Sequence, residues 1–534
     1  MLITLVWFII INARFFVFLY YKPCIMINYI SERQLTIEEF KTPFQTSLLA
    51  DNRWVKLASV VPWDDFAAAY ISMMNSDFGR PGISPRLVLG SLIIKHKEKL
   101  DDRGVITAIQ ENIYMQFFVG LKEFNPEPIF DPSLFVEIRK RVGKDIFDSL
   151  NVKLIKSVSE KNDEKQNNTS EKGNNDTSPN KGKLQADATV ADQYITYPTD
   201  NGILNQSRKQ CEKLIDKLYE LNDKKGTKPR TYRKVLDASY LSYSKKRTKS
   251  NSKHRKMTYK LLEALHRDIK HINKLLDLFE SEKKPFPLNH KEQQMLWIVN
   301  HAYIQQKHMY DEKIHSHVDR TVNIFQPHVR PIPRGKIKSK VEFGSKLGVS
   351  LDQGFTRIDT FSWDAYNEGG DLIKQVENYK TLHGHYPELV QVDKIYATRK
   401  NRMWLKEKGI RITAVPLGRK RKKPQDTYYQ KSKRKKEATE RNQIEGKFGQ
   451  GKNGYNLNQI RAKLISTSES WVACIFFVMN LIHYEKITSF YSVFCATINS
   501  ISIKIDPIEQ LLEDFNQTIF YLSKSSKRMI MLKC

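Results

Sequence analysis

The sequence has few cysteines, and they are not arranged for a zinc site or a disulfide framework. Only five occur in 534 residues, widely spaced and without a Cys-x-x-Cys pair. Secreted disulfide scaffolds need an even, dense set of cysteines, and zinc ribbons need closely spaced pairs. The sequence therefore argues against both and predicts a reducing compartment, with the protein in the cytoplasm.

Acidic residues are scarce beside basic ones. Asp and Glu number 59 against 88 Lys and Arg, which gives a net charge of +29. With 28% charged residues a multi-span membrane protein is excluded, and with 40% hydrophobic residues a wholly disordered chain is excluded. A charge of this size and sign is typical of a protein that binds a polyanion, most often nucleic acid. A protein that is merely basic is the alternative.

Long hydrophobic runs are nearly missing, apart from residues 1–21. About 20 apolar residues could span a bilayer. No basic segment precedes the run, however, and no small-residue cleavage site follows it, so it makes a poor signal peptide. We interpret residues 1–25 as an apolar N-terminal extension, with Met26 as an alternative start and a membrane anchor as the minor alternative.

Hydrophobic residues are absent altogether from Ser159–Lys183, which is mostly Asn, Lys, Ser, Glu and Gly. Such a segment cannot bury enough area to offset the entropy lost on ordering. We therefore expect a low-complexity linker over residues 158–183. A chain of this length also needs two or three domains, so a linker separating two of them is reasonable.

Residues 40–157 have a helical pattern. Apolar residues recur at three- and four-residue spacing in Arg86–Leu100, Gly104–Leu121 and Leu134–Ile155. Ser84-Pro85 and Asp131-Pro132 resemble helix starts, because proline is well tolerated at a first helical position. The spacing predicts a helical module.

The third of these helices carries three consecutive basic residues, Arg139, Lys140 and Arg141. A basic helix that follows a tight turn could lie along DNA. The same residues could equally form an ordinary solvated helix face.

Residues 184–485 combine a strand-like start with a helical block and then an α/β pattern. Leu184–Asp192 is the first expected strand, and the helical block covers about residues 204–313. Within that block a 3-4-3-4-3 spacing predicts a heptad seam and an antiparallel hairpin with the helix around Gln293–Gln306. The seam residues are Leu262, Leu265, Ile269, Ile272, Leu276 and Phe279.

Beyond Thr321 the pattern predicts a mixed sheet with helices on its faces. The expected strands are Val322–Phe325, Val341–Thr360, Leu389–Val392 and Ile410–Val415. The expected helices are Asp371–Thr381, Arg399–Lys408 and Tyr428–Phe448. The fold class is therefore mixed α+β and α/β, with an all-helical N-terminal module and residues 486–534 as a C-terminal tail.

Three carboxylates lie where such a fold concentrates function. Asp187 is inside the first strand, Asp393 directly follows an apolar strand, and Glu445 is near the end of a long basic helix. Oxygen ligands suit hard divalent cations, and two such ions can activate a nucleophile and stabilise a leaving oxygen in phosphodiester displacement. A lone aspartate is more often a turn or cap residue. Spacing alone therefore does not decide whether these carboxylates bind metal or only cap turns and helices.

The surroundings of Glu445 are more specific. Arg441, Glu445 and Lys452 are spaced i, i+4 and i+11, which keeps them on roughly one helix face. A carboxylate between two cations suits a site where a phosphate backbone lies beside a metal, although an i, i+4 Arg–Glu pair is also common on solvated helices. Glycines after Glu445 weaken the helix and would allow Lys452 to lie on a loop.

These stretches resemble bacterial insertion-sequence transposases of the Asp-Asp-Glu class, over about residues 40–485. The resemblance rests on Asp131-Pro-Ser-Leu-Phe with Arg139-Lys-Arg141, on Asp187-Ala-Thr-Val, on the segment 392–401 and on the segment 441–452. The last matches the Tyr-x2-Arg-x3-Glu-x6-Lys signature at Arg441, Glu445 and Lys452, and departs from it at Ala438. Asp192 and Asp200 are the alternatives to Asp187 as the first carboxylate.

The resemblance implies an RNase H-like catalytic core with a large helical insertion, in a nucleoid-associated bacterial enzyme. Asp187, Asp393 and Glu445 would hold two Mg²⁺ or Mn²⁺ ions, for cleavage at transposon ends and strand transfer into target DNA. Arg441 and Lys452 would bracket the DNA backbone. The implied partners are the double-stranded terminal repeats, the target DNA and further copies of the chain in a synaptic complex. A catalytically inactive DNA-binding remnant or regulator is the alternative.

Basic runs elsewhere predict steeply salt-dependent binding to nucleic acid, or else are merely solvated surface. Two of them, Arg419–Lys423 and Lys431–Lys436, precede the Glu445 segment, and two more, Lys245–Arg247 and Lys253–Lys256, lie in the helical insertion. Two His-x-His pairs have metal-compatible spacing but lack a cysteine or third ligand, so we assign them no site. They are His315 with His317 and His383 with His385.

Overall fold

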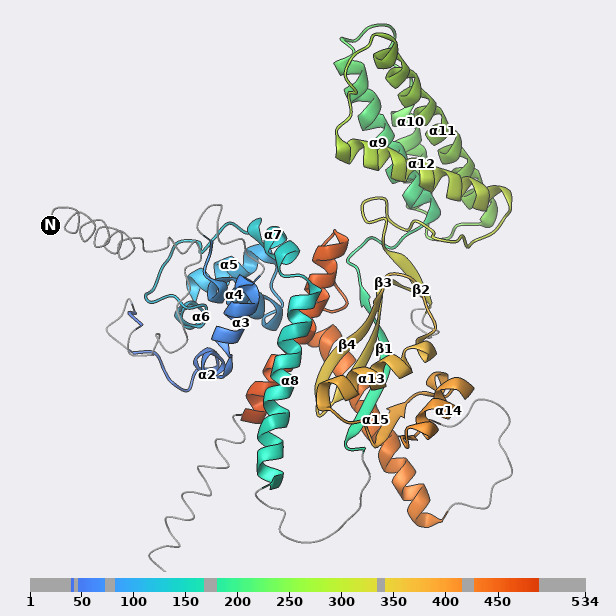
Figure 1. Ribbon diagram of the computed structural model, residues 1–534. Coiled ribbons are helices and arrows are strands. Elements are labelled where there is room, and N and C mark those ends of the chain that lie inside the picture. Colours follow the sequence, from blue (N-terminus) through green and yellow to red (C-terminus); the bar gives the residue numbers. More distant parts are fainter. Residues whose placement is uncertain are drawn as a thin grey trace, which may run out of the picture.

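The computed structural model describes residues 40–42, 47–72, 82–167, 180–333, 341–414 and 427–488, without the side chains of 159–167. The expected N-terminal extension, most of the C-terminal tail and the basic run 419–423 lie outside these residues. So does the part of the expected linker from 168 to 179. Figure 1 shows N-terminal helices beside a sheet with flanking helices, and a helical bundle projecting from one end of the sheet.

Helices are the only regular elements among the described residues from 47 to 167, as the spacing predicts. Helix α4 begins at Pro85 behind Ser84, as expected. The second expected helix is divided at Asn112, because the Asn112 side chain accepts hydrogen bonds from the backbone N–H groups of Tyr114 and Met115 and so caps a new helix. The helices are α2 (Arg53–Val60), α3 (Trp63–Ile71), α4 (Pro85–Lys97), α5 (Asp102–Glu111), α6 (Ile113–Phe118), α7 (Leu134–Arg141) and α8 (Lys144–Asn167).

Two details of this part differ from the sequence prediction. Asp131-Pro132 forms a turn, in which the Asp131 carboxylate accepts from the Ser133 N–H at 2.8 Å, and α7 begins only at Leu134. Helix α8 continues to Asn167, past the expected boundary of the linker. Its first half is held by buried Phe147 and Leu150, and once a helix is nucleated each added residue costs little.

The sheet has six strands, four joined by antiparallel pairing and two further ones that pair in parallel. Strand β3 pairs antiparallel with β1 on one side and with β2 and β4 on the other, while β1, β5 and β6 are mutually parallel. This mixed sheet with many helices confirms the expected fold class. The strands are β1 (Lys183–Asp192), β2 (Arg330–Pro333), β3 (Val341–Asp352), β4 (Phe355–Ser362), β5 (Leu389–Val392) and β6 (Arg411–Ile412). The expected strand Val322–Phe325 is wrong, because the segment turns, with the Asn323 side chain accepting from the Phe325 N–H at 2.8 Å.

Alternate residues of β1 and β5 face opposite sides of the sheet, and this alternation decides which helix covers which face. Ala186 and Val392 pack with Leu372, Val376 and neighbouring apolar side chains of helices α13 (Leu372–His383) and α14 (Arg399–Glu407). The opposite face of the same strands is crossed by the long helix α15 (Tyr428–Gly454). The two faces are therefore chemically different, one apolar and one polar.

The helix Ile465–Thr488 joins the N-terminal helices to the sheet. Phe477 makes aromatic contacts with Phe66 of α3 and Phe147 of α8, and the Asn480 amide hydrogen-bonds Thr356 of β4 and Asn151 of α8. Among the described residues this helix is long and apolar enough to cross a membrane, but 78% of its apolar window is buried inside the protein. It is therefore a core helix, in which Trp471, Cys474, Phe476 and Phe477 are all buried.

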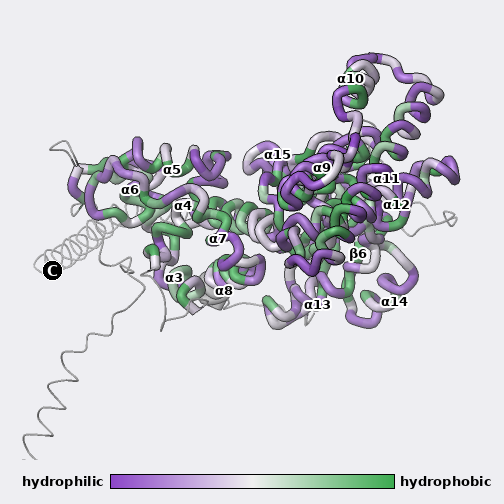
Figure 2. The backbone as a smooth tube through the Cα atoms, turned by 90° about the horizontal axis from the view of Figure 1, so that it is seen from above, coloured by the Kyte–Doolittle hydropathy of each residue, from purple (hydrophilic) through white to green (hydrophobic). Residues whose placement is uncertain are grey.

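A four-helix bundle is inserted between β1 and β2. It consists of α9 (Asp200–Leu221), α10 (Arg233–Ser244), α11 (Asn251–Ser281) and α12 (His290–Asp311). Five of the six predicted seam residues are buried and Leu276 is half-buried, but α11 packs most extensively on α9 rather than on α12. The hairpin expected between α11 and α12 is thus only part of the packing. In Figure 2 helix α10 stands at the periphery of the molecule.

Candidate active site

Asp187 and Asp393 lie side by side on neighbouring strands. Strand β1 pairs in parallel with β5, and the last register pair joins Ala186 to Val392. Each carboxylate residue comes one position later, so the two reach the same level of the sheet. Asp187 accepts a hydrogen bond from the Ala188 N–H, and Asp393 accepts one from the Lys394 N–H, both at 2.8 Å.

Helix α15 covers the face of the sheet on which both carboxylates lie. Gln185 and Gln391 stand two residues before the carboxylates and therefore share their faces. The Gln185 amide donates to the Glu440 carbonyl at 2.9 Å, and the Gln391 amide donates to the Glu437 carbonyl at 3.2 Å. Two buried glutamines thus fix the helix across β1 and β5, directly before the two aspartates.

The position of helix α15 on the sheet also determines where Arg441 and Glu445 lie. Arg441 lies close enough to Asp187 to lower the pKa of its carboxyl group, and its guanidinium is 3.4 Å from a Glu445 carboxylate oxygen. The side chain of Glu445 is 56% exposed, whereas that of Arg441 is only 24% exposed. Glu445, the third predicted carboxylate, is therefore on helix α15, which covers the two aspartates. Arg441, with which it pairs, is the more buried of the two side chains.

Asp187 is the most perturbed carboxylate of this group. Burial is the largest cause, and together with the negative charges of Glu368 and Asp393 it raises the pKa of Asp187 to about 6. The Ala188 N–H and Arg441 act in the opposite direction but do not cancel the effect. A half-buried carboxylate among other carboxylates is stabilised by any cation that binds beside it.

Glu368 is a fourth carboxylate that sequence reasoning missed. It lies in the 3-10 turn η2 (Glu368–Gly370), and the Asn401 amide ties this turn to the turn η3 (Lys394–Tyr396) after Asp393. Gly369 permits the close approach, since a Cβ there would stand 2.6 Å from the Ile395 carbonyl oxygen. The sequence signal that could have pointed to Glu368 is an acidic residue before a Gly-Gly pair, in the connection between a strand and a helix.

Glu368 is itself held by Lys346 of β3. The Lys346 ammonium is 2.7 Å from a Glu368 carboxylate oxygen and 2.8 Å from the Tyr366 carbonyl oxygen, and both charged side chains are largely buried. The Glu368 charge is close enough to Asp187 to raise its pKa, and the Lys346 ammonium compensates that charge. The sheet therefore fixes Glu368 near the two aspartates.

The donor set suits a hard divalent cation in its chemistry, since Asp187, Asp393 and Glu368 offer carboxylate oxygens. Across the described residues, however, no three His, Cys, Asp or Glu side chains are gathered closely enough to hold a metal ion. The structure therefore brings Asp187 and Asp393 together with Glu368 nearby, and leaves Glu445 paired with Arg441 at the edge of the site.

Lys452 has a different place from the one that the signature implies. Helix α15 continues through its glycines to Gly454, because Gly451 packs closely on Leu457 and Met479. Lys452 is therefore on the helix, and its ammonium lies 3.3 Å from Glu342 and 3.5 Å from Asp192. The prediction that it could lie on a loop is wrong, and its charge is shared with two carboxylates.

The two alternatives for the first carboxylate lie elsewhere. Asp192 is at the far end of β1 beside Lys452, and Asp200 is in the first turn of α9, 2.6 Å from Arg320. Neither contributes to the charges that shift the pKa of Asp187. Asp187 is therefore the carboxylate of β1 that stands beside Asp393.

The predicted DNA-contacting run of α7 divides into one buried and two exposed residues. Arg139 is only 4% exposed, forms two hydrogen bonds of 2.8 and 2.9 Å with Asp102, and lies over the Trp471 ring. Its prediction as a DNA contact is corrected by this burial, because the guanidinium already has a carboxylate partner. Lys140 and Arg141 are exposed, with Lys140 paired to Glu137.

The histidine pairs form no metal site among the described residues. His383 instead pairs with Asp352 at 2.6 Å and stacks near Tyr379 and His385. The two cysteines that the structure describes, Cys211 and Cys474, are buried and free.

Two family models match the chain on either side of the bundle. Residues 43–141 match a transposase domain, DUF772, and residues 390–482 match the Transposase DDE domain. The first match covers most of the N-terminal helices, and the second includes Asp393, Glu445 and most of the core helix. The two matches support an insertion-sequence transposase of the Asp-Asp-Glu class, which confirms the resemblance drawn from the sequence.

A curated relative is similar in part. The chain is 29% identical over 147 residues to a protein of Rhizobium meliloti, "Uncharacterized protein ORF8 in nfe locus". The match covers 28% of this chain and spans about 65% of the relative's length. No solved structure matches the chain.

Proposed function

We propose that the protein is a DNA transposase that cleaves DNA at the ends of its element and transfers the strands into a target, with divalent metal ions as cofactors. The transposase domains already support a protein that acts on DNA. The observation that carries the finer proposal is the register of β1 and β5, which places Asp187 beside Asp393 under α15.

Asp187 and Asp393 would hold the metal, with Glu445 as the third carboxylate and Glu368 as a further nearby one. Bound there, Mg²⁺ or Mn²⁺ would activate the attacking oxygen and stabilise the leaving oxygen. The chain's own part is to supply the carboxylates and to hold them at one level of the sheet. Arg441 keeps a positive charge between Asp187 and Glu445, and the same charge would attract the DNA phosphate next to the scissile bond.

One observation favours the alternative of a DNA-binding protein without nuclease activity. In the described residues the carboxylates are not gathered into a three-residue metal group, since Glu445 is paired with Arg441 and largely exposed. Under our proposal Glu445 exchanges Arg441 for the metal when DNA and metal bind. Under the alternative it does not, and the protein binds the ends and never cuts them.

A cleavage assay distinguishes the proposed transposase from a DNA-binding protein without nuclease activity. The full chain is incubated with DNA carrying the element ends, with Mg²⁺, Mn²⁺ or EDTA, and with unrelated DNA as a control for a general nuclease. We expect nicking at the ends that requires the metal. Asp393→Ala should abolish nicking and retain end binding, whereas Asp277→Ala, at an exposed position of α11, should change neither. Binding without nicking under either metal would favour the alternative, and nicking by Asp393→Ala would overturn the proposed site.

A further inference from the structure

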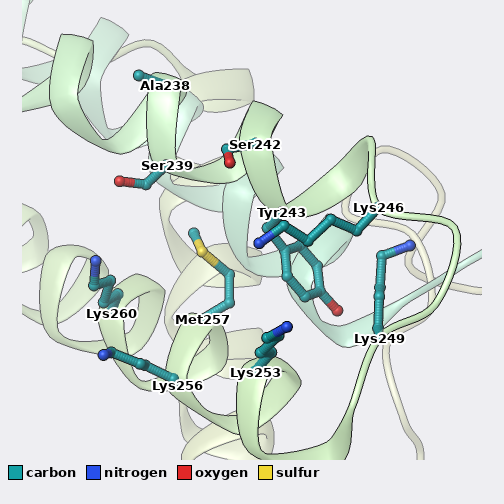
Figure 3. Close-up of a pocket in the computed structure, with 10 residues that line it drawn as sticks. All are labelled: Ala238, Ser239, Ser242, Tyr243, Lys246, Lys249, Lys253, Lys256, Met257 and Lys260. Carbon is teal, nitrogen blue, oxygen red and sulfur yellow. The ribbon is translucent and has the colours of Figure 1, made fainter.

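A lysine-lined pocket lies in the inserted bundle, in the part of the molecule that the site does not use. It has a volume of about 470 Å³ and lies between α10 and α11. Figure 3 shows its lining residues on these two helices and on the segment joining them. We call its five lysines the pocket lysines: Lys246, Lys249, Lys253, Lys256 and Lys260.

No carboxylate lines this pocket, and within the described residues none of the pocket lysines forms an ion pair. Other lysines of the same bundle behave differently, since Lys217 pairs with Glu292, Lys225 with Glu282 and Lys307 with Asp311. Five uncompensated positive charges around one pocket repel each other. An anion bound among them would remove that repulsion.

The pocket lysines on α11 form a row. Lys253, Lys256 and Lys260 are spaced i, i+3 and i+7, which puts them on one face of the helix. With a rise of 1.5 Å per residue the row is about 10 Å long. Phosphates on one strand of duplex DNA follow each other every 3.4 Å or so along the axis, so the row spans about three of them. A single phosphate would use only part of it.

The floor of the pocket is held in place by neutral contacts. Met257 is 5% exposed and belongs to the apolar core of the bundle. The Tyr243 hydroxyl is 2.8 Å from a His254 ring nitrogen, and this contact links α10 to α11. The hydroxyl groups of Ser239 and Ser242 add neutral donors at the α10 side. The pocket therefore has a polar lining, and its floor is held in place by the packing of Met257 and by the Tyr243–His254 contact.

We propose that the pocket lysines bind the phosphate backbone of duplex DNA without reading its sequence. This inference rests on the proposed function, because a transposase must hold DNA beyond the few nucleotides at the site of cleavage. In Figure 1 helices α10 and α11 belong to the bundle that projects beyond the sheet. The pocket would therefore hold a stretch of duplex away from the cleavage site.

The test compares two triple variants of the full chain that lose the same charge. Lys253→Gln, Lys256→Gln and Lys260→Gln together remove the row on α11. Lys213→Gln, Lys291→Gln and Lys313→Gln together remove three exposed lysines of α9, α12 and the segment after α12, outside the pocket. Circular dichroism and thermal unfolding show whether both variants keep the fold. Affinity for a 40-base-pair duplex is then measured at several salt concentrations.

We expect the row variant to bind at least about tenfold more weakly, with the slope of log affinity against log salt reduced by about 2 to 3. The control variant should stay close to the wild-type protein. Equal losses in both variants would overturn the inference in favour of a general charge effect. A loss confined to RNA of the same length would overturn it in favour of an RNA partner.

The outcome also separates this inference from the proposed function. If the wild-type protein binds no duplex DNA at all, the proposed function fails and the inference fails with it. If the wild-type protein binds and cuts DNA, but the row variant binds with an unchanged salt slope, only the inference fails.

Discussion

Asp187 and Asp393 stand directly after Ala186 and Val392, the last register pair of two parallel strands. Chain segments about 200 residues apart are thereby brought to one level of the sheet, and burial with the charges of Glu368 and Asp393 raises the pKa of Asp187. Four expected outcomes follow from this arrangement and from the ion pairs of Arg139 and Lys452 elsewhere in the molecule.

The first concerns the stability of the metal-free protein. The pKa of Asp187 rises from 3.8 to about 6 on folding, so the folded state binds its proton more tightly than the unfolded state. Stability from this group is present at low pH and is lost as the pH rises through about 6. We expect Asp187→Asn to stabilise the metal-free protein at pH 8 by up to about 2 kcal/mol, and hardly at all near pH 4.

Urea unfolding in EDTA at both pH values measures this difference. Asp277→Asn, on an exposed face of α11, is the control and should show no pH-dependent gain. A stabilisation of Asp187→Asn that is equal at pH 4 and pH 8 would contradict the electrostatic explanation.

The second prediction concerns the two charges on either side of Asp187. Glu368 raises the pKa of Asp187 and Arg441 lowers it. Glu368→Gln should therefore move the pH at which Asp187 ionises downward, and Arg441→Gln should move it upward. The shift is read from the pH dependence of thermal unfolding in each background, with and without Asp187→Asn. Shifts of the same sign in both variants would show that the two side chains act through packing instead.

The third prediction separates the residues of the basic run on α7. Arg139→Ala should destabilise the protein by about 3 kcal/mol, because it removes one of the two cationic partners of the Asp102 carboxylate and leaves only the buried Lys95 paired with it. Lys140→Ala removes an exposed charge and should cost less than about 1 kcal/mol. Urea unfolding compares them. Equal small losses would mean that the Arg139 pair contributes nothing to the fold.

The surroundings of Arg139 support a structural role. The carboxyl group of Asp102 is desolvated, yet its hydrogen bonds to Arg139 and the charges of Arg139 and Lys95 keep its pKa at about 2. Burial lowers the pKa of Lys95 to about 8. Removal of Arg139 should therefore raise the pKa of both groups, which makes the loss of stability in Arg139→Ala depend on pH.

The fourth prediction concerns Lys452, which joins the end of α15 to the sheet. Its ammonium contacts Glu342 of β3 and Asp192 of β1, and all three side chains are largely buried. A double-mutant cycle of Lys452→Met and Glu342→Gln should give a coupling of about 1 kcal/mol or more. Additive losses of stability in the two single variants would mean that Lys452 and Glu342 are not coupled. The DNA contact that the signature implies would then be the better explanation of the Lys452 charge.

Local patterns were enough for most elements of the core. Apolar spacing predicted β3, β4, β5, α13 and α14, and Pro85 marked the start of α4, because these signals depend on neighbouring residues alone. The strand expected at Val322–Phe325 was wrong, because the Asn323 side chain forms a local turn that competes with strand pairing. The persistence of α15 through its glycines also escaped prediction, since it depends on the contact of Gly451 with Leu457 and Met479.

The sequence by itself determined the charge, the helical and strand segments and the carboxylates of the resemblance, since composition, periodicity and motif spacing are properties of the chain. Only the tertiary structure decided which charges are available. It buried Arg139 against Asp102, attached Lys452 to Glu342, brought Glu368 to Asp187 and left the pocket lysines without carboxylates. The reason is that the energy of a charge depends on its distance to other charges and on its burial, and both are set by segments far apart in the chain.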